Sequence, residues 1–192
     1  MDAEALTEQE KNCLLQIARQ ALEEAVGQSK PAARVVQSPS ARLQQSGASF
    51  VTLTINGSLR GCIGALEPYQ SLIEDVREHA MAAALQDYRF PPVTPEELAG
   101  IQIEISCLTR PLPLDYSDAE DLLKKLRPQI DGVVIRDGIR RATFLPQVWE
   151  KIVEPAEFLE HLCLKMGAAP DLWRHRHLDV LVYQVEEFRE PV

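Results

Sequence analysis

The sequence predicts an α+β protein in which antiparallel or mixed strands pack beside helices. Two hairpin turns are indicated, at Asn56-Gly57 and at Asp137-Gly138, and each joins two strands directly. Segments with helical periodicity are interleaved with these hairpins and with single strands. Because neighbouring parallel strands need a crossover connection, this interleaving disfavours a doubly wound parallel sheet.

Four segments carry helix signals. Three of them begin with capping boxes, in which a Ser or Thr stands three residues before a Glu, at Thr7, Ser71 and Ser117. The first helix is expected to end at Gly27, which can adopt a left-handed conformation. The second is expected to end before Pro91-Pro92, because a proline disfavours helix in the residue ahead of it. A fourth helix is expected over residues 157–166, and residues 30–49, rich in Pro, Ser, Ala and Gln, are expected to connect the first helix to the first strand.

The strand signals begin with the hairpin at residues 50–63. A two-residue turn at Asn56-Gly57 places Leu53 opposite Arg60. It also places Val51 opposite Cys62, and since side chains alternate along a strand, Arg60 and Cys62 are expected to share a face. Further strands are expected at Ile101–Cys107, Gly132–Arg136, Ile139–Phe144 and Leu178–Phe188, the last as a single closing strand.

Length and charge limit the class of protein. The 192 residues correspond to about 1.3 average domains, so one domain with a smaller lobe is the expected organisation. The formal net charge of −9 argues against broad nucleic-acid binding, which depends on neutralising phosphates. The acidic start Met1–Glu4 lacks the basic region of a signal peptide, and no apolar run approaches the roughly 20 residues that cross a membrane. We therefore expect a cytoplasmic protein that binds neither nucleic acid nor membrane.

The cysteine spacing and the absence of known catalytic motifs reduce the number of reaction classes that the sequence supports. The four cysteines lie far apart and form no CxxC pair, so a compact zinc module is not predicted and reduced thiols are expected. Walker A, GxGxxG, GxSxG and HExxH patterns are absent from the sequence, which removes support for nucleotide hydrolysis, Rossmann redox chemistry and zincin proteolysis. No metal or cofactor is predicted, and the four histidines are assigned no role. A metal site remains an alternative that needs Cys62, Cys107 and Cys163 to converge in space.

The segment around Cys62 is the strongest candidate for chemistry. Gly61 and Gly64 flank it and allow close approach of the backbone to another group. Arg60 can stabilise a thiolate at Cys62, or it can clamp a substrate carboxylate or phosphate through its planar guanidinium. The alternative is that Cys62 is a small core residue opposite Val51, because free cysteine is among the most buried residue types.

These residues carry a resemblance to the AMMECR1 family. Leu59-Arg60-Gly61-Cys62-Ile63-Gly64 matches the signature hexapeptide of that family, and the strand Phe50–Leu53 precedes it. Tyr88 and Met166 depart from the family pattern, where proline and alanine are usual, but both lie outside the hexapeptide. Further matching blocks follow in family order, namely Asp87 with Arg89–Val93, Ile103–Ser106, Phe144–Trp149, Leu162–Gly167 and Trp173.

The resemblance covers about residues 7–190 as a single AMMECR1-like domain. It implies a compact α+β fold with a larger and a smaller lobe and with the hexapeptide near their interface. It also implies that bacterial and archaeal members belong to the AmmeMemoRadiSam system, in which they act with a Memo-like protein and a radical S-adenosylmethionine (radical SAM) protein. The resemblance names no reaction for that system.

Three more residues join the candidate site. Asp87 and Arg89 fall where a helix passes into a stiff Pro-containing loop, so they are candidates for substrate binding, with a local helix cap as the alternative. Glu104 lies on the polar side of its strand. If that face closes over the hairpin, Glu104 can act as an acid or base near Cys62; otherwise it faces water.

Two functions follow as hypotheses. The leading hypothesis is a thiol-dependent enzyme component, in which Cys62 reacts, Arg60 supports it and Glu104 transfers protons. The rival is a non-catalytic adaptor that uses the same groove. In the adaptor, contact energy would come from arginines and aromatic residues, which are enriched at interfaces, namely Arg60, Arg89, Phe90 and Trp149.

Overall fold

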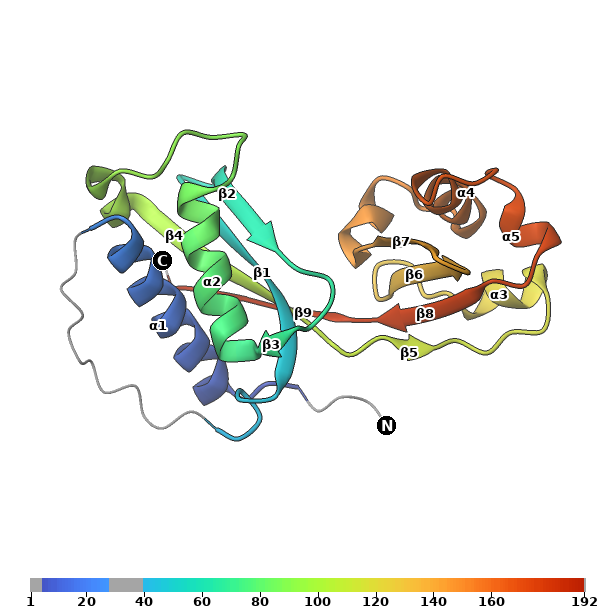
Figure 1. Cartoon of the computed structure of the whole chain (residues 1–192), viewed down its shortest axis with the longest axis horizontal. Helices are drawn as coiled ribbons and strands as arrows, with labels where there is room; N and C mark the ends of the chain where they lie inside the picture. The colour runs from blue at the N-terminus through green and yellow to red at the C-terminus, as the bar shows by residue number, and fades with distance from the viewer. Residues whose placement is uncertain (1–4, 28–39, 192) are drawn as a thin grey trace. The chain divides into compact units, whose positions relative to one another are not determined.

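The computed structural model describes residues 5–27 and 40–191, which divide into two compact units. The described residues up to Leu108 form the first unit together with those from Glu186 onward, and Thr109–Val185 form the second. Each unit has its own antiparallel sheet (Figure 1). The prediction of an α+β fold is confirmed.

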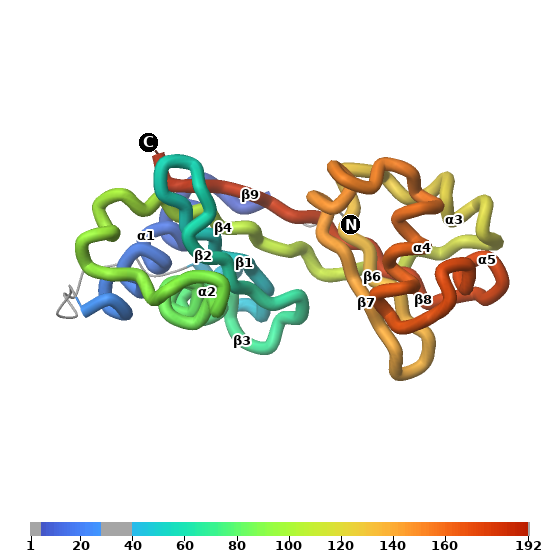
Figure 2. The backbone as a smooth tube through the Cα atoms, turned by 90° about the horizontal axis from the view of Figure 1, so that it is seen from above, coloured from blue at the N-terminus to red at the C-terminus, as the bar shows by residue number. Residues whose placement is uncertain are grey.

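The first unit is a sheet with two long helices. The helices are α1 (Glu8–Ala25) and α2 (Leu72–Leu85), followed by the short 3-10 helix η1 (Pro95–Gly100). The strands are β1 (Ser46–Ile55), β2 (Ser58–Gly64), β3 (Gln70–Ser71), β4 (Ile101–Leu108) and β9 (Val185–Arg189). The main sheet has the order β2-β1-β4-β9, and β3 pairs with β1. Figure 2 shows β9 running beside β4, although nearly the whole second unit separates them in the chain.

Local sequence signals set the ends of the two long helices. Thr7 and Glu10 form the expected capping box at the start of α1, and Gly27 follows the helix with a φ of +83°. Ser71 caps α2 by accepting a hydrogen bond from the backbone of Glu74 at 3.4 Å. The apolar sides of both helices pack with the buried side of β1, including Val51, into one core. Of the expected connection over residues 30–49, residues 30–39 lie outside the described part. The prediction was wrong for residues 46–49, which already belong to β1.

The second unit is a four-stranded sheet with shorter helices. Its strands have the order β5-β8-β6-β7. They are β5 (Leu112–Pro113), β6 (Gly132–Asp137), β7 (Arg140–Phe144) and β8 (Asp179–Tyr183). The helices are α3 (Ala119–Lys125), the 3-10 helix η2 (Pro146–Glu150), α4 (Pro155–Lys165) and α5 (Leu172–His175). None of the helices in the described part of the chain is both long and apolar enough to cross a membrane.

Two local predictions in the second unit were wrong. The cap of α3 is Asp118, whose Oδ1 accepts from the backbone of Asp121 at 2.9 Å. The predicted cap, Ser117, instead donates its own N–H to Asp121. The second hairpin turns at Gly138-Ile139 because Asp137 already pairs with Arg140. Gly138 has a φ of +62°, as the first position of a type II′ turn requires.

The predicted closing strand over residues 178–188 is two strands in two different sheets. The break falls at Gln184, whose backbone N–H donates to Thr109 Oγ1 at 2.8 Å and whose carbonyl accepts from the Thr109 N–H at 2.9 Å. These two hydrogen bonds hold together the places where the chain enters and leaves the second unit. Hydrophobic alternation continues through the break, so the sequence pattern could not locate it.

Candidate functional site

A β-bulge sets the position of Cys62. The turn at Asn56-Gly57 forms as expected. The pairing of β1 with β2 then shifts by one residue between Thr54 and Leu53, so that Leu53 lies opposite Gly61. The extra residue in the bulged strand shifts by one position every pair that lies farther from the turn. Cys62 therefore lies opposite Thr52, and the predicted pairing with Val51 was wrong.

Cys62 lies on the sheet face that turns away from the helices. Val51 and Leu53 are fully buried against the helix layer. Gly61 shares that face, and a Cβ atom at this position would overlap the carbonyl oxygen of Ala83 on α2. Because side chains alternate along a strand, the next residue, Cys62, points to the opposite face, where it is half-buried. The interpretation of Cys62 as a core residue beside Val51 is therefore excluded.

Cys62, Thr52 and Glu104 form a row across three neighbouring strands. Thr52 lies between the other two, because it is the register partner of Cys62 on β2 and of Glu104 on β4. Its hydroxyl donates to Cys62 Sγ at 3.2 Å. Two strand spacings separate Cys62 from Glu104, or about 10 Å between their backbones. Glu104 is half-buried, and its carboxylate has no ion pair within the described chain.

Asp87 and Arg89 hold the peptide groups of Cys62. Asp87 Oδ2 accepts from the Cys62 N–H at 2.8 Å, and Arg89 Nη2 donates to the Cys62 carbonyl at 3.2 Å. The two side chains also bind each other, with Arg89 Nη2 2.6 Å from Asp87 Oδ2. The Arg89 guanidinium holds the pKa of Asp87 well below its usual range. Since β2 is an edge strand, this pair occupies backbone groups that would otherwise be free to pair with another strand.

Arg60 is bound to Glu97 and not to the thiol. Its Nε lies 2.7 Å from Glu97 Oε1, and its Nη2 lies 3.0 Å from Oε2. Further bonds run to the carbonyls of Pro91 (2.9 Å) and Pro92 (3.2 Å). The Arg60 hydrogen bonds lower the pKa of Glu97 to about 2. Arg60 thus fastens the loop that follows α2 to strand β2.

Sequence reasoning missed Glu97 and Thr52. A signal for Glu97 was present, because it follows Thr94 by three residues, and it accepts from the Thr94 N–H at 2.8 Å. No pattern indicated Thr52, whose contact with the thiol depends on the bulge. Gly64 lies under the Phe50 ring, which a Cβ atom would overlap. A binding role for Gly61 and Gly64 therefore stays a prediction, beside the packing role that the structure gives them.

The remaining cysteines lie elsewhere. All four thiols are free. Cys107 lies opposite Ser49 on the helix-facing side of the sheet, and burial raises its pKa to about 12. Cys62 and Cys107 therefore point to opposite faces, so the convergence that a cysteine metal site needs does not occur. Among residues 5–27 and 40–191, no group of three His, Cys, Asp or Glu side chains is placed to bind a metal ion.

A buried Ser, Asp and His lie together near Cys107 without the arrangement of a hydrolase triad. Ser49 Oγ donates to Asp75 Oδ2 at 2.6 Å, and His79 Nδ1 lies 3.2 Å from the same oxygen without hydrogen-bond geometry. A triad needs the histidine between the serine and the carboxylate. Here the carboxylate is central, so the serine has no base.

These features define an α+β protein in which a half-buried cysteine lies in a glycine-flanked edge strand, with its peptide groups held by a carboxylate–guanidinium pair. The chain belongs to the AMMECR1 family, whose model matches residues 15–188.

Archaeal proteins are similar over almost the whole chain. A protein of Thermofilum pendens is 38% identical, with 96% of this chain and 92% of the relative covered. A protein of Methanothermobacter thermautotrophicus is 40% identical, with 96% of each chain covered. The crystal structure of the uncharacterised protein PH0010 from Pyrococcus horikoshii matches with a TM-score of 0.78 at 31% identity, covering 96% of this chain and 93% of that one.

Proposed function

We propose that this protein acts through the Cys62 thiol, as a thiol-dependent enzyme component that works with a Memo-like protein and a radical SAM protein. The observation that carries the proposal is the hydrogen bond from the Thr52 hydroxyl to Cys62 Sγ. A donor aimed at a sulfur atom stabilises negative charge there, and the thiolate is the nucleophilic form of cysteine. Asp87 and Arg89 bind the Cys62 peptide groups and so fix the backbone position from which the side chain extends.

The other candidate residues have separate parts in this proposal. Glu104 faces the same side of the sheet as Cys62, and Thr52 lies between them. A substrate lying over Thr52 would touch both groups, so Glu104 can exchange a proton with it. Arg60 and Arg89 position the loop that follows α2 against strand β2, since both guanidiniums are already bound to carboxylates.

Alkylation kinetics test the proposal. Iodoacetamide at neutral pH, followed by peptide mass spectrometry, measures the labelling rate of each thiol. Cys13 is the internal control, because it is also half-buried and burial raises its pKa. We expect Cys62 to react faster than Cys13, and Thr52→Val to slow Cys62 by about threefold to tenfold through loss of one hydrogen bond worth about 0.5–1.5 kcal/mol. Thr54→Val, on the same face of β1, is the matched control and should change nothing.

Equal labelling of Cys62 and Cys13, or equal effects of the two threonine variants, would contradict a positioned thiolate. Activity of the reconstituted three-protein system that survives Cys62→Ser would contradict the enzymatic proposal. In that system Glu104→Gln is expected to change the pH profile of the rate, because it removes the proposed proton carrier.

A second candidate function is the adaptor, and one observation favours it. Tyr88 stands between Asp87 and Arg89 and is 95% exposed, so a rigidly held loop presents an aromatic side chain to a partner. Trp149 cannot contribute as hypothesised, because it is fully buried against Phe158 in the second unit. Co-purification with the Memo-like or radical SAM protein that is lost on Arg60→Ala and kept on Cys62→Ser would support the adaptor.

A further inference from the structure

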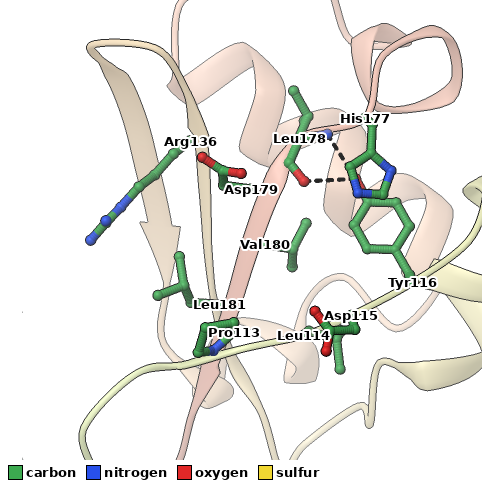
Figure 3. A pocket seen from close by; sticks show the side chains of 10 residues that line it. All are labelled: Pro113, Leu114, Asp115, Tyr116, Arg136, His177, Leu178, Asp179, Val180 and Leu181. Carbon is green, nitrogen blue, oxygen red and sulfur yellow. Dashed lines mark hydrogen bonds between the residues drawn. The ribbon is translucent and has the colours of Figure 1, made fainter.

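A pocket in the second unit contains none of the residues discussed so far as a candidate site (Figure 3). It has a volume of about 310 Å³ and lies between the segment 113–116 and the start of β8, residues 177–181. This volume is at the lower end of the range for small-molecule sites. A ligand of roughly ten to fifteen non-hydrogen atoms would fill it.

One wall of the pocket is a rigid pair of stacked rings. Tyr116 and His177 are parallel to within 18°, with ring centroids 4.2 Å apart. The Tyr116 hydroxyl donates to the Leu178 carbonyl at 2.8 Å and accepts from the Leu178 N–H at 2.7 Å. Tyr116 is buried, whereas His177 is exposed. Backbone hydrogen bonds therefore fix the Tyr116 ring, and His177 stacks on it and presents its other face.

The charged groups of the pocket are mainly acidic. Asp115 and Asp179 are both exposed, and within the described chain neither carboxylate has an ion pair. Burial raises the pKa of Tyr116, and the negative charge of Asp179 raises it further. Arg136 is the register partner of Asp179 on β6, but Figure 3 shows its side chain extending away from Asp179. The space between the carboxylates and the rings thus has negative character.

Apolar side chains complete the lining. Leu181 lies on β8 two residues after Asp179, and Pro113 is its register partner on β5, whereas Val180 between them is buried in the core. A flat or apolar ligand body can pack against these side chains and the rings, while a positive group can bind between the carboxylates. Cations are also attracted to the faces of aromatic rings. Among the ten residues that line the pocket, Arg136 carries the one guanidinium and none is a lysine.

We propose that this pocket binds a small organic cation, namely an amine with an aromatic or apolar body. The inference is independent of Cys62, which lies in the other unit. It gives a role to His177, to which the sequence pattern alone assigned none.

Amide NMR titration of the full chain with tyramine tests the proposal. We expect saturable shifts confined to residues 114–116, Arg136 and 177–181, with a millimolar or tighter Kd. The neutral analogue 4-ethylphenol and the anionic analogue 3-(4-hydroxyphenyl)propionate should bind at least tenfold more weakly. Asp115→Asn and Asp179→Asn should each raise the Kd for tyramine at least threefold. His177→Ala should raise it by a similar factor.

The control variant is Glu120→Gln, which changes net charge equally at an exposed position of α3 outside the pocket. It should leave the Kd unchanged, as should Cys62→Ser. The proposal is overturned if the anion binds as well as tyramine, if the shifts fall away from the residues that line the pocket, or if no binding occurs at 10 mM, roughly ten times the Kd of a weak millimolar ligand. Equal effects of Glu120→Gln and the two aspartate variants would also overturn it, because binding would then follow net charge alone.

Discussion

The backbone N–H of Cys62 donates to Asp87 Oδ2 at 2.8 Å, across 25 residues of sequence. This bond ties the edge strand of the first sheet to the loop after α2, and Arg89 completes the connection through the Cys62 carbonyl. The cysteine is thereby held by its backbone in a half-buried position. A second pair, Arg60 with Glu97, fastens the same loop further along.

Removing the carboxylate of Asp87 should loosen Cys62. In Asp87→Ala the Cys62 N–H loses its acceptor and Arg89 loses its partner, so we expect a loss of about 2–3 kcal/mol in the free energy of unfolding. Hydrogen exchange at the Cys62 amide should accelerate correspondingly. Tyr88→Ala is the control in the same loop, since Tyr88 is 95% exposed. If the free energy of unfolding falls no further in Asp87→Ala than in Tyr88→Ala, the bond from Asp87 to Cys62 does not stabilise the fold.

Gly61 is required by the close approach of α2. In Gly61→Ala the added Cβ overlaps the Ala83 carbonyl oxygen, so β2 and the helix must separate, at an expected cost of about 2–4 kcal/mol. Gly100→Ala is the matched control, because its Cβ would lie 3.9 Å from the nearest atom, Cγ2 of Ile55. Urea unfolding of the two variants measures the difference. A Gly61→Ala protein as stable as Gly100→Ala would refute the packing argument.

The Arg60–Glu97 pair should stabilise the fold above pH 4.5 and lose its effect in acid. Arg60 lowers the pKa of Glu97 to about 2 in the folded protein, whereas the unfolded value is about 4.3. A carboxyl with a lowered folded pKa contributes stability above its unfolded pKa, and this contribution disappears as pH falls to the folded value. Because the pair is partly exposed, we expect Glu97→Gln to cost only about 1 kcal/mol at neutral pH.

The measurement for this pair is denaturant unfolding of wild type and Glu97→Gln between pH 7 and pH 2. The difference between the two should shrink below pH 4.5. Glu74→Gln is the control, since Glu74 is exposed on α2 and has no ion pair among the described residues. A pH-independent difference for Glu97→Gln would contradict the ion pair as its cause.

The Tyr116 hydroxyl should stabilise the second unit by bridging Leu178. In Tyr116→Phe the buried N–H and carbonyl of Leu178 both lose this partner, so thermal unfolding should reveal a loss of about 1–3 kcal/mol. Tyr88→Phe should have no effect, because that hydroxyl is at an exposed position. If the two variants have the same free energy of unfolding, the hydrogen bonds from Tyr116 to Leu178 do not stabilise the second unit.

Several elements could be predicted because their signals are local. The capping box at Thr7, the turn at Asn56-Gly57 and the glycine after α1 depend on the conformational preferences of a few neighbouring residues. The alternation of β4 was equally clear, because one face of that strand is buried and the other is half-exposed. The residues of the hexapeptide were recognisable from sequence alone, and the chain does belong to the AMMECR1 family.

The sequence by itself determined the fold class, most of the helix and strand positions, and the family. Tertiary structure alone decided the bulge that turns Cys62 toward Thr52, the partners that bind Arg60 and Asp87, and the break at Gln184 that divides one apparent strand between two sheets. Pairing register and long-range hydrogen bonds join segments that are distant along the chain, so no local pattern records them. For that reason the sequence could single out Cys62, but only the fold shows which face it occupies and what holds it there.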